Sequence, residues 1–309
     1  MFFLNALPGA VAEGLIWGLM AIGVYISYKI LDIADLTVDG SICTGACVCA
    51  VLISNGAPVW LSMIVAFIAG ALAGIVSGVF NTAFGIPSIL AGILTQLILY
   101  SVNLAILGGK SLVSLVGGQH KLLLSMSNNP MAIVSAGLLI TATIICLWLF
   151  FYTEVGLTLK STGDNADMSR AQGVNVKFNK VLGLAIANGI VALAGSLLAQ
   201  YKGSANINDG RGAIVIALAA IFIGLSVSLK IKPNFVVSLI GVVGGGIVYY
   251  IIYNFVVLLG LKTDYLKMLS AIIVVVFLAV PYIKGEYFKK QKSVVRASAV
   301  NNAGGGENA

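Results

Sequence analysis

Long apolar runs, separated by short polar stretches, make up most of the chain. Nine runs are present, at residues 9–29, 41–54, 58–82, 87–108, 130–152, 181–200, 212–229, 234–260 and 264–284. A helix of about 20 apolar residues crosses the roughly 30 Å hydrocarbon core of a bilayer. The runs are continuous and do not alternate, so they predict helices and not the strands of a membrane barrel. We therefore expect an all-α, polytopic integral membrane bundle of about nine to ten transmembrane or re-entrant helices.

Three of these runs are irregular. The run 41–54 is short and rich in Gly, Cys and Ser. The run 87–108 begins at the Gly-Ile-Pro-Ser sequence of residues 85–88, and the run 212–229 begins at the Asp-Gly-Arg-Gly sequence of residues 209–212. Irregular backbone at membrane depth is tolerated only where protein or a water-filled cavity surrounds it. These runs are candidates for broken or partly re-entrant helices.

The two halves of the chain resemble each other. Residues 35–40 follow the first run and residues 205–210 follow the sixth, and both segments end in Asp-Gly. Further along, Gly70 and Gly74 correspond to Gly241 and Gly245. Five spans separate the two copies, which gives them opposite orientations. The pattern predicts two inverted repeats with a solute pathway at their interface.

Glycines four residues apart predict close helix packing. Gly70, Gly74 and Gly78 form two overlapping GxxxG steps, and Gly241 and Gly245 form another. Such steps let helix backbones approach where lipid provides no hydrophobic drive. Packing within one chain is the favoured interpretation, and a subunit interface is the alternative.

Composition excludes a soluble protein. Apolar residues make up 59% of the chain and charged residues 9%, and the mean hydropathy is +1.03, whereas a soluble domain carries about 25% charged residues. The first run lacks a basic leader and is long enough to span, so we expect a retained helix and not a cleaved signal peptide. The four cysteines lie in apolar runs and the chain has one histidine, so neither a metal site nor any other cofactor is expected. The expected location is the plasma (inner) membrane, with multiple passes.

Basic residues set the expected orientation. If the loop 153–180 and the tail after residue 284 are cytoplasmic, twelve of the 18 Lys and Arg residues lie inside, as the positive-inside rule requires. We expect one transmembrane domain over residues 1–285. Residues 286–309 form a cytoplasmic tail, basic and then rich in Gly and Asn, that we expect to be disordered.

The sequence contains no complete catalytic or nucleotide-binding motif. The Gly-Lys-Ser at 109–111 lacks the first glycine of a Walker A loop, and the Gly-Arg-Gly at 210–212 lacks the third glycine of a dinucleotide fingerprint. The spans hold no paired carboxylates and no Ser/His arrangement, so an enzyme is not expected. Polar residues in the spans or at their ends are candidates for a translocation path, although amides in spans also tie helices together. The candidates are Asp39, Gln96, Asn103, Asn188 and Asp209.

The polar loop 153–180 is too long for an ordinary helix connection. Thr162 or Asp164 is placed to cap a short helix, Asp167 lies in its first turn, and Gly173 is placed to stop it. This pattern predicts a two-turn polar helix on the cytoplasmic surface. A docking element is the favoured interpretation, and a plain connector is the alternative.

This loop resembles the coupling-helix region of ABC importer permeases of the branched-chain amino acid and ribose type. The order matches: a Gly after the fifth span, a Gly-x-Asn-x-x-Met helix, and Gly-Val-Asn before the next span. Residues 30–41 and 213–224 are also similar to that family, most closely to its branch for amino acid, often aromatic amino acid, uptake. Leu225 departs from the pattern where an acidic residue is expected. The resemblance extends over about residues 10–285.

The resemblance implies a membrane-spanning subunit that translocates a small solute, an amino acid. Its implied partners are cytoplasmic ATPase subunits that bind the ATP, an extracytoplasmic substrate-binding protein, and a second permease copy, most simply as a homodimer. The implied ATPase-coupling residues are Gly163, Asp164, Asn165, Ala166, Asp167, Met168, Arg170, Ala171 and Gly173. A secondary transporter usually needs ionisable residues inside its spans, and these are nearly missing here. That alternative and a channel stay open.

Overall fold

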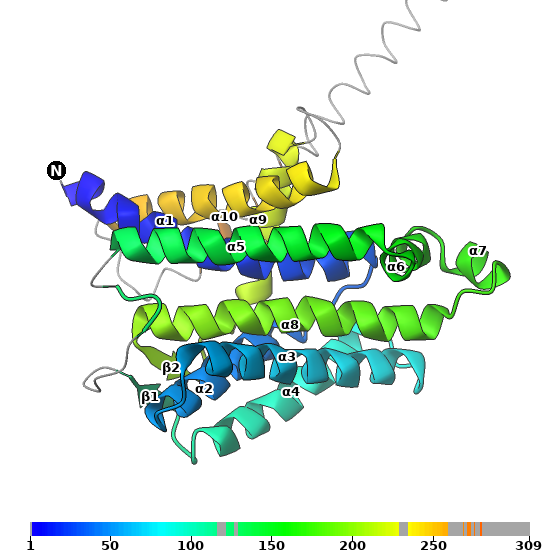
Figure 1. The fold of residues 1–309 in the computed structure, drawn as a ribbon, viewed down its shortest axis with the longest axis horizontal. Coiled ribbons are helices and arrows are strands. Elements are labelled where there is room, and N and C mark those ends of the chain that lie inside the picture. Colours follow the sequence, from blue (N-terminus) through cyan, green and yellow to red (C-terminus); the bar gives the residue numbers. More distant parts are fainter. Residues whose placement is uncertain are drawn as a thin grey trace, which may run out of the picture.

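A computed structural model describes residues 2–115, 122–126, 129–228 and 234–258, with five single positions beyond them. Almost every described element is a helix (Figure 1). In chain order the elements are α1 (Phe2–Tyr25), the π-helical turn η1 (Ile26–Ile30), α2 (Val38–Ser54), α3 (Val59–Thr82), α4 (Ser88–Ile106), β1 (Leu112–Ser114), α5 (Asn129–Tyr152), α6 (Glu154–Asp164), α7 (Ala166–Ala171), α8 (Val176–Lys202), β2 (Ser204–Asn206), α9 (Ala213–Ser228) and α10 (Phe235–Leu258).

The predicted helical bundle is confirmed over the described residues. Eight of the nine apolar runs coincide with helices, and the ninth, 264–284, is described only at the five single positions. Six helices there are long and apolar enough to span a membrane: α1 with η1, α3, α4, α5, α8 and α10. The helices α2 and α9 are shorter, as expected for runs two and seven. By contrast, α4 has 19 residues and is long enough to cross, so the fourth run is not broken.

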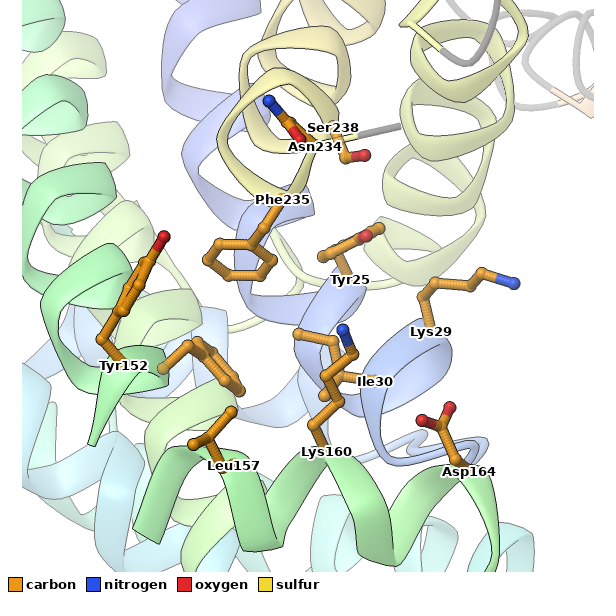
Figure 2. Close-up of a pocket in the computed structure, with 11 residues that line it drawn as sticks. Tyr25, Lys29, Ile30, Tyr152, Leu157, Lys160, Asp164, Asn234, Phe235 and Ser238 are labelled. Atoms are coloured by element: carbon orange, nitrogen blue, oxygen red, sulfur yellow. The ribbon is translucent and has the colours of Figure 1, made fainter. Parts of the chain in front are cut away.

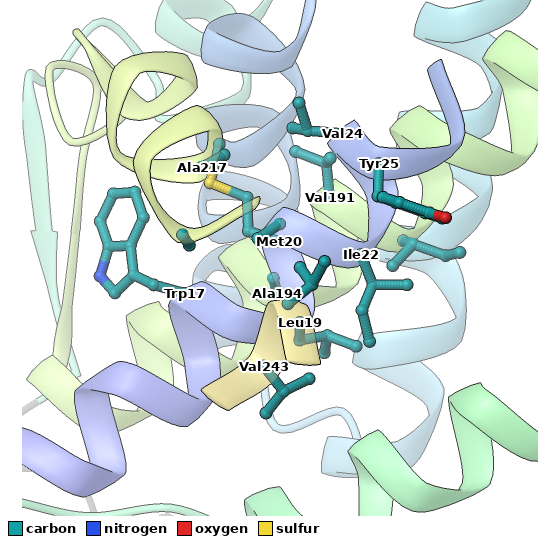
Figure 3. Close-up of a cluster of buried hydrophobic side chains, with 14 of the residues drawn as sticks. Trp17, Leu19, Met20, Ile22, Val24, Tyr25, Val191, Ala194, Ala217 and Val243 are labelled. Atoms are coloured by element: carbon teal, nitrogen blue, oxygen red, sulfur yellow. The ribbon is translucent and has the colours of Figure 1, made fainter. Parts of the chain in front are cut away.

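Helices α1 and α8 form the centre of the bundle. Both are buried along most of their length, and their packing excludes even a small side chain at Gly23, where an added Cβ would lie 2.7 Å from the carbonyl oxygen of Ala187. Around Met20 of α1, apolar side chains from α8, α9 and α10 interdigitate, among them Val191, Ala217 and Val243 (Figure 3). Dispersion contacts of this kind replace the hydrophobic drive that lipid does not supply.

Helices α3, α4 and α5 form the periphery. Their outward faces carry large apolar side chains such as Leu72, Leu97 and Leu138, which are 57%, 63% and 65% exposed. An apolar surface of this extent suits hydrocarbon and would not be stable in water.

The predicted glycine faces lie against neighbouring helices of the same chain. On α3, added Cβ atoms at Gly70, Gly74 and Gly78 would meet the backbone or side chains of α8. On α10, one at Gly245 would meet the backbone of α9 at Ala220, and Gly224 of α9 lies against the backbone of Gly241. These contacts are intrachain packing.

The two ends of the bundle differ (Figure 1). At one end β1 and β2 form a two-stranded antiparallel sheet, with Val113 opposite Ala205. At the other end α6 and α7 project between α5 and α8. The predicted tail 286–309 lies outside the described residues. Long helix, short helix and long helix follow one another twice, as α1–α2–α3 and α8–α9–α10, but the inverted relation of the halves stays a prediction.

Candidate translocation and coupling sites

The chain turns back into the bundle after η1. Residues 31–37 are not helical, and Asp32, with φ of 54°, makes the reversal in a conformation that few residues except glycine adopt. The segment then reaches the middle of α8, because Asp35 contacts Asn188. This backbone is surrounded by α2, α4 and α8 and not by lipid, which is the condition for irregular structure at this depth.

A buried polar network holds this segment in place. Asp35 is 3% exposed and accepts hydrogen bonds from the Thr37 backbone N–H at 2.9 Å and from the Asn188 Nδ2 at 2.6 Å. The Oδ1 of Asn188 accepts from the Ser41 hydroxyl at 2.6 Å. The Asp35 carboxylate and the Asn188 amide are thus paired, as buried polar groups require, whereas the buried Thr37 hydroxyl has no partner among the described residues. The network fastens the start of α2 to the centre of α8.

The start of α2 also holds the start of α9. The Asp39 carboxylate accepts from the backbone N–H groups of Gly212, at 2.9 Å, and Ile214, at 2.8 Å. These donors lie at the N-terminal end of α9, where free N–H groups and the helix dipole favour an anion. Gly210 lies against the Asp39 backbone so closely that no Cβ could fit. The Gly210 N–H also donates to the Cys43 Sγ at 3.0 Å.

A cavity of about 460 Å³ opens beside this junction. It lies between α2, α4 and the loop before α9, and its polar lining is Asp39, Gln96, Asn103, Tyr100 and Arg211. Asn103 is 1% exposed, and its Oδ1 accepts no hydrogen bond from any described residue. A buried acceptor without a donor costs roughly 1–3 kcal/mol. The cavity thus offers a cation, a carboxylate and an unpaired acceptor to a small polar ligand.

The polar loop between α5 and α8 forms two helices at the opposite end of the bundle. Thr153 caps α6 by accepting from the Gly156 N–H at 3.3 Å, and Asn165 caps α7 by accepting from the Met168 N–H at 3.0 Å. Asp167 pairs with Arg170 at 3.1 Å. Helix α7 presents Met168, which is 60% exposed, to the outside. It is a short, capped, outward-facing element.

The rest of the loop is fixed to the membrane helices. The backbone of Gly163 in α6 contacts Ile30 in η1 so closely that a Cβ could not be placed there. The Nδ2 of Asn179, in α8, donates to the Thr162 hydroxyl of α6 at 3.0 Å. After α7 the chain turns at Gly173, with φ of +84°.

Residues 9–278 match the family described as the branched-chain amino acid transport system permease component. The chain belongs to this family. A tyrosine transport system permease protein of Clostridioides difficile is 37% identical over 276 residues, which are 89% of this chain and 91% of that protein. An uncharacterised protein of Rickettsia prowazekii is 34% identical over 285 residues, 92% of this chain and 99% of that protein.

A more distant relative is the autoinducer 2 import system permease protein of Salmonella typhimurium. It is 28% identical over 191 residues, which are 60% of this chain and 54% of that protein. No solved structure matches this permease. The permease is a multi-pass protein of the inner membrane, and its relatives are transport permeases and not enzymes. Permeases of ABC importers work with ATPase and substrate-binding partners in general.

The structure brings together three of the five candidate path residues of the permease. Asp39, Gln96 and Asn103 line the cavity. Asn188 does not line it but holds Asp35, and Asp209 pairs with Lys202 at 3.4 Å in the loop beside it. Among described residues no group of His, Cys, Asp and Glu is arranged to hold a metal ion.

Sequence reasoning missed two residues of this region and misplaced one cap. Arg211 lines the cavity, and Asp35 lies at the centre of the buried network. The prediction that Thr162 or Asp164 caps the short helix is wrong, because both belong to α6 and Asn165 is the cap of α7. The Thr162 hydroxyl donates to the Thr158 carbonyl at 2.7 Å and is not available to a following helix.

Proposed function

We propose that this permease is the membrane-spanning subunit of an ATP-driven importer, and that α7 is the element on which a separate ATPase docks. The observation that carries the proposal is the way α7 is built: it is capped, exposed, and joined through α6 to η1 and to α8. Closure of two ATPase subunits around ATP would displace α6 and α7 together. The permease itself then needs no cofactor, and ATP is bound by the partner.

We infer that the solute is an amino acid and that it passes the cavity beside Asp39. Arg211 would bind the carboxylate, because a guanidinium matches its geometry. The Asn103 Oδ1 and the Asp39 carboxylate would accept from the ammonium group. The tyrosine transport permease of Clostridioides difficile supports this class of solute, since it matches over nearly the whole chain.

The side of the permease on which the cavity opens supports a second copy as partner. Arg211 and Tyr100 are exposed there, and Gln96 is half-buried. Polar and charged groups on a span are costly against hydrocarbon. A homodimer that covers α4 would enclose the cavity between two copies, and an extracytoplasmic binding protein would deliver the solute to it.

The test compares two glycines of the same conformation. Gly173 follows α7 with φ of +84°, and Gly56 follows α2 with φ of +85°. A Cβ added to either glycine would have no other atom within 4 Å. Valine strains the backbone equally at both positions, because β-branched residues disfavour positive φ. We expect Gly173→Val, and also Ala171→Glu, to abolish ATP-driven uptake in reconstituted vesicles and to release the ATPase during purification. Gly56→Val should keep both activities. Wild-type uptake and ATPase binding by Gly173→Val would refute the docking role of α7.

A further inference from the structure

A second cavity, of about 410 Å³, lies at the end of the bundle that carries α6. It is bounded by η1, the end of α5, α6 and the start of α10, and it shares no lining residue with the cavity beside Asp39 (Figure 2). Its charged residues are Lys29, Lys160 and Asp164. The transport path proposed above does not use it.

The charges of this cavity have both signs. Lys160 and Asp164 are four residues apart on α6, and Figure 2 shows both side chains rising from the helix toward η1, which carries Lys29. Within the described ranges none of the three is in an ion pair. Two cations and one anion are therefore available to a ligand that carries both charges.

The remaining walls are aromatic. Phe151 and Phe235 lie with their ring centroids 4.9 Å apart, and Tyr25 and Tyr152 flank them (Figure 2). Rings at such separations attract a further ring through offset or edge-to-face contacts. The Ser238 hydroxyl adds one polar group to this side.

We propose that this cavity binds a free aromatic amino acid on the cytoplasmic side of the membrane. Lys29 and Lys160 receive the carboxylate, Asp164 receives the ammonium group, and the ring enters between Tyr25, Phe151, Tyr152 and Phe235. An anionic phospholipid headgroup could also reach a cavity at the surface of the membrane, but sites that bind anionic headgroups are clusters of basic residues. Asp164 disfavours a phosphate and favours a zwitterion.

Occupancy has a consequence for α6. The ligand contacts Lys160 and Asp164 on one side and η1 and α10 on the other, so it holds α6 against the membrane helices. A ligand that binds one arrangement better than another shifts the equilibrium toward it. Amino acid accumulated inside would therefore slow further import. This last step rests on the proposed function, whereas the binding itself does not.

The binding test uses the permease alone in phosphatidylcholine nanodiscs with radiolabelled L-phenylalanine. Lys160→Gln and Asp164→Asn should each weaken binding roughly 10- to 100-fold, the loss expected of a charged contact. Lys177→Gln, an exposed position that does not line the cavity, is the control. Size-exclusion chromatography checks that each variant is folded. Equal binding by all variants would overturn the site.

Two analogues identify which charge contacts which residue. Phenylacetate lacks the ammonium group and phenethylamine lacks the carboxylate, so wild-type permease should bind both more weakly than L-phenylalanine. In Asp164→Asn the preference over phenylacetate should disappear, and in Lys160→Gln the preference over phenethylamine should shrink. The permease should bind L-phenylalanine equally well in nanodiscs that contain phosphatidylglycerol. Displacement of L-phenylalanine by this lipid would identify a headgroup site and overturn the proposal.

The feedback test uses the complete importer in vesicles preloaded with L-phenylalanine. Uptake by the wild type should be slower in preloaded than in empty vesicles. In Lys160→Gln the ratio of uptake in preloaded vesicles to uptake in empty vesicles should rise toward one. If the importer shows ATP-driven uptake but its L-phenylalanine binding does not depend on Lys160 and Asp164, this site is refuted and the proposed function stands. If binding depends on both residues but no ATP-driven uptake is seen, the proposed function alone is refuted.

Discussion

Gly244 and Gly245 are neighbours on α10 and have opposite surroundings. A Cβ added to Gly245 would collide with the Ala220 carbonyl oxygen of α9 and lie 2.8 Å from the Gly224 nitrogen, whereas one added to Gly244 has nothing within 4 Å. Gly245→Ala must therefore move backbone against backbone, and overpacking of this kind costs about 1–3 kcal/mol. Gly244→Ala should be tolerated.

The pair isolates packing from helix propensity. Each substitution removes a glycine from a helix interior, which contributes about 0.5–1 kcal/mol of stability in favour of alanine. This contribution is shared and cancels in the difference between the two variants. The difference should therefore equal the overpacking cost, about 1–3 kcal/mol, with Gly245→Ala the less stable.

Thermal unfolding of purified permease in detergent, followed by size-exclusion chromatography, measures the difference. Gly244→Ala should unfold at or above the wild-type temperature, and Gly245→Ala should unfold below it. Equal unfolding temperatures would show that α9 and α10 do not approach at Gly245 as closely as the structure has them.

Two further predictions concern the candidate path and its support. Arg211→Gln should lower amino acid uptake about tenfold by removing a charged contact with the solute. Lys202→Gln should lower uptake less, because Lys202 does not line the cavity. Equal losses of uptake would argue against a path beside Asp39. Asn188→Leu should lower the free energy of unfolding by about 3 kcal/mol or more, since it removes the side-chain donor to the buried Asp35 carboxylate and leaves only the Thr37 N–H. Asn179→Leu, which removes a hydrogen bond to a neutral hydroxyl, should lower the free energy of unfolding by about 1–3 kcal/mol. Chemical denaturation in detergent measures both variants. Equal losses of stability would contradict the buried network around Asp35.

Helix positions could be predicted because the information is local. An apolar run long enough to span favours a helix whatever its neighbours are, and eight runs coincide with helices. The turn at Gly173 was predictable for the same reason, since glycine readily adopts positive φ. Helix α6 was missed although its buried residues Gly156, Leu159 and Thr162 recur every three positions. That spacing on a short polar segment was the available signal.

The candidate site was only partly predictable because its contacts are tertiary. Gln96 and Asn103 were selected as amides in a span, and they share a cavity with Asp39. Nothing near Arg211 in the sequence indicates that it faces the same cavity across 172 positions from Asp39. Asp35 begins the segment 35–40 that was compared between the two halves, but it was not selected as a site residue, because its partner Asn188 lies on a helix that only the fold brings near.

The contacts of the two halves test the repeat more strictly than the glycine alignment does. Helix α3 packs against α8, and α10 packs against α1, which is the exchange of partners expected of two repeated halves, whether parallel or inverted. The aligned glycines do not show this exchange of partners. Gly74 faces α8, so its counterpart should face α1, but Gly245 faces α9. On α10 it is Gly246 that faces α1, at Gly14 and Gly18. The alignment of the glycines is therefore displaced by one residue relative to the contacts.

A displacement of α6 has a short physical route to the cavity. Gly163 contacts the backbone of Ile30, which precedes the non-helical segment 31–37. That segment ends at α2, whose Asp39 caps α9 and lines the cavity. Helix α8 passes the same region as one continuous rod and is fixed to α3 by close backbone contacts. If an ATPase displaces α6, we expect segment 31–37 to move more than α8, because α3 holds α8 along its length even though Asn179 of α8 also bonds to Thr162 of α6. The hydrogen bond between Asn188 and Asp35 joins segment 31–37 to α8, so we expect its loss to affect uptake more than it affects ATPase binding.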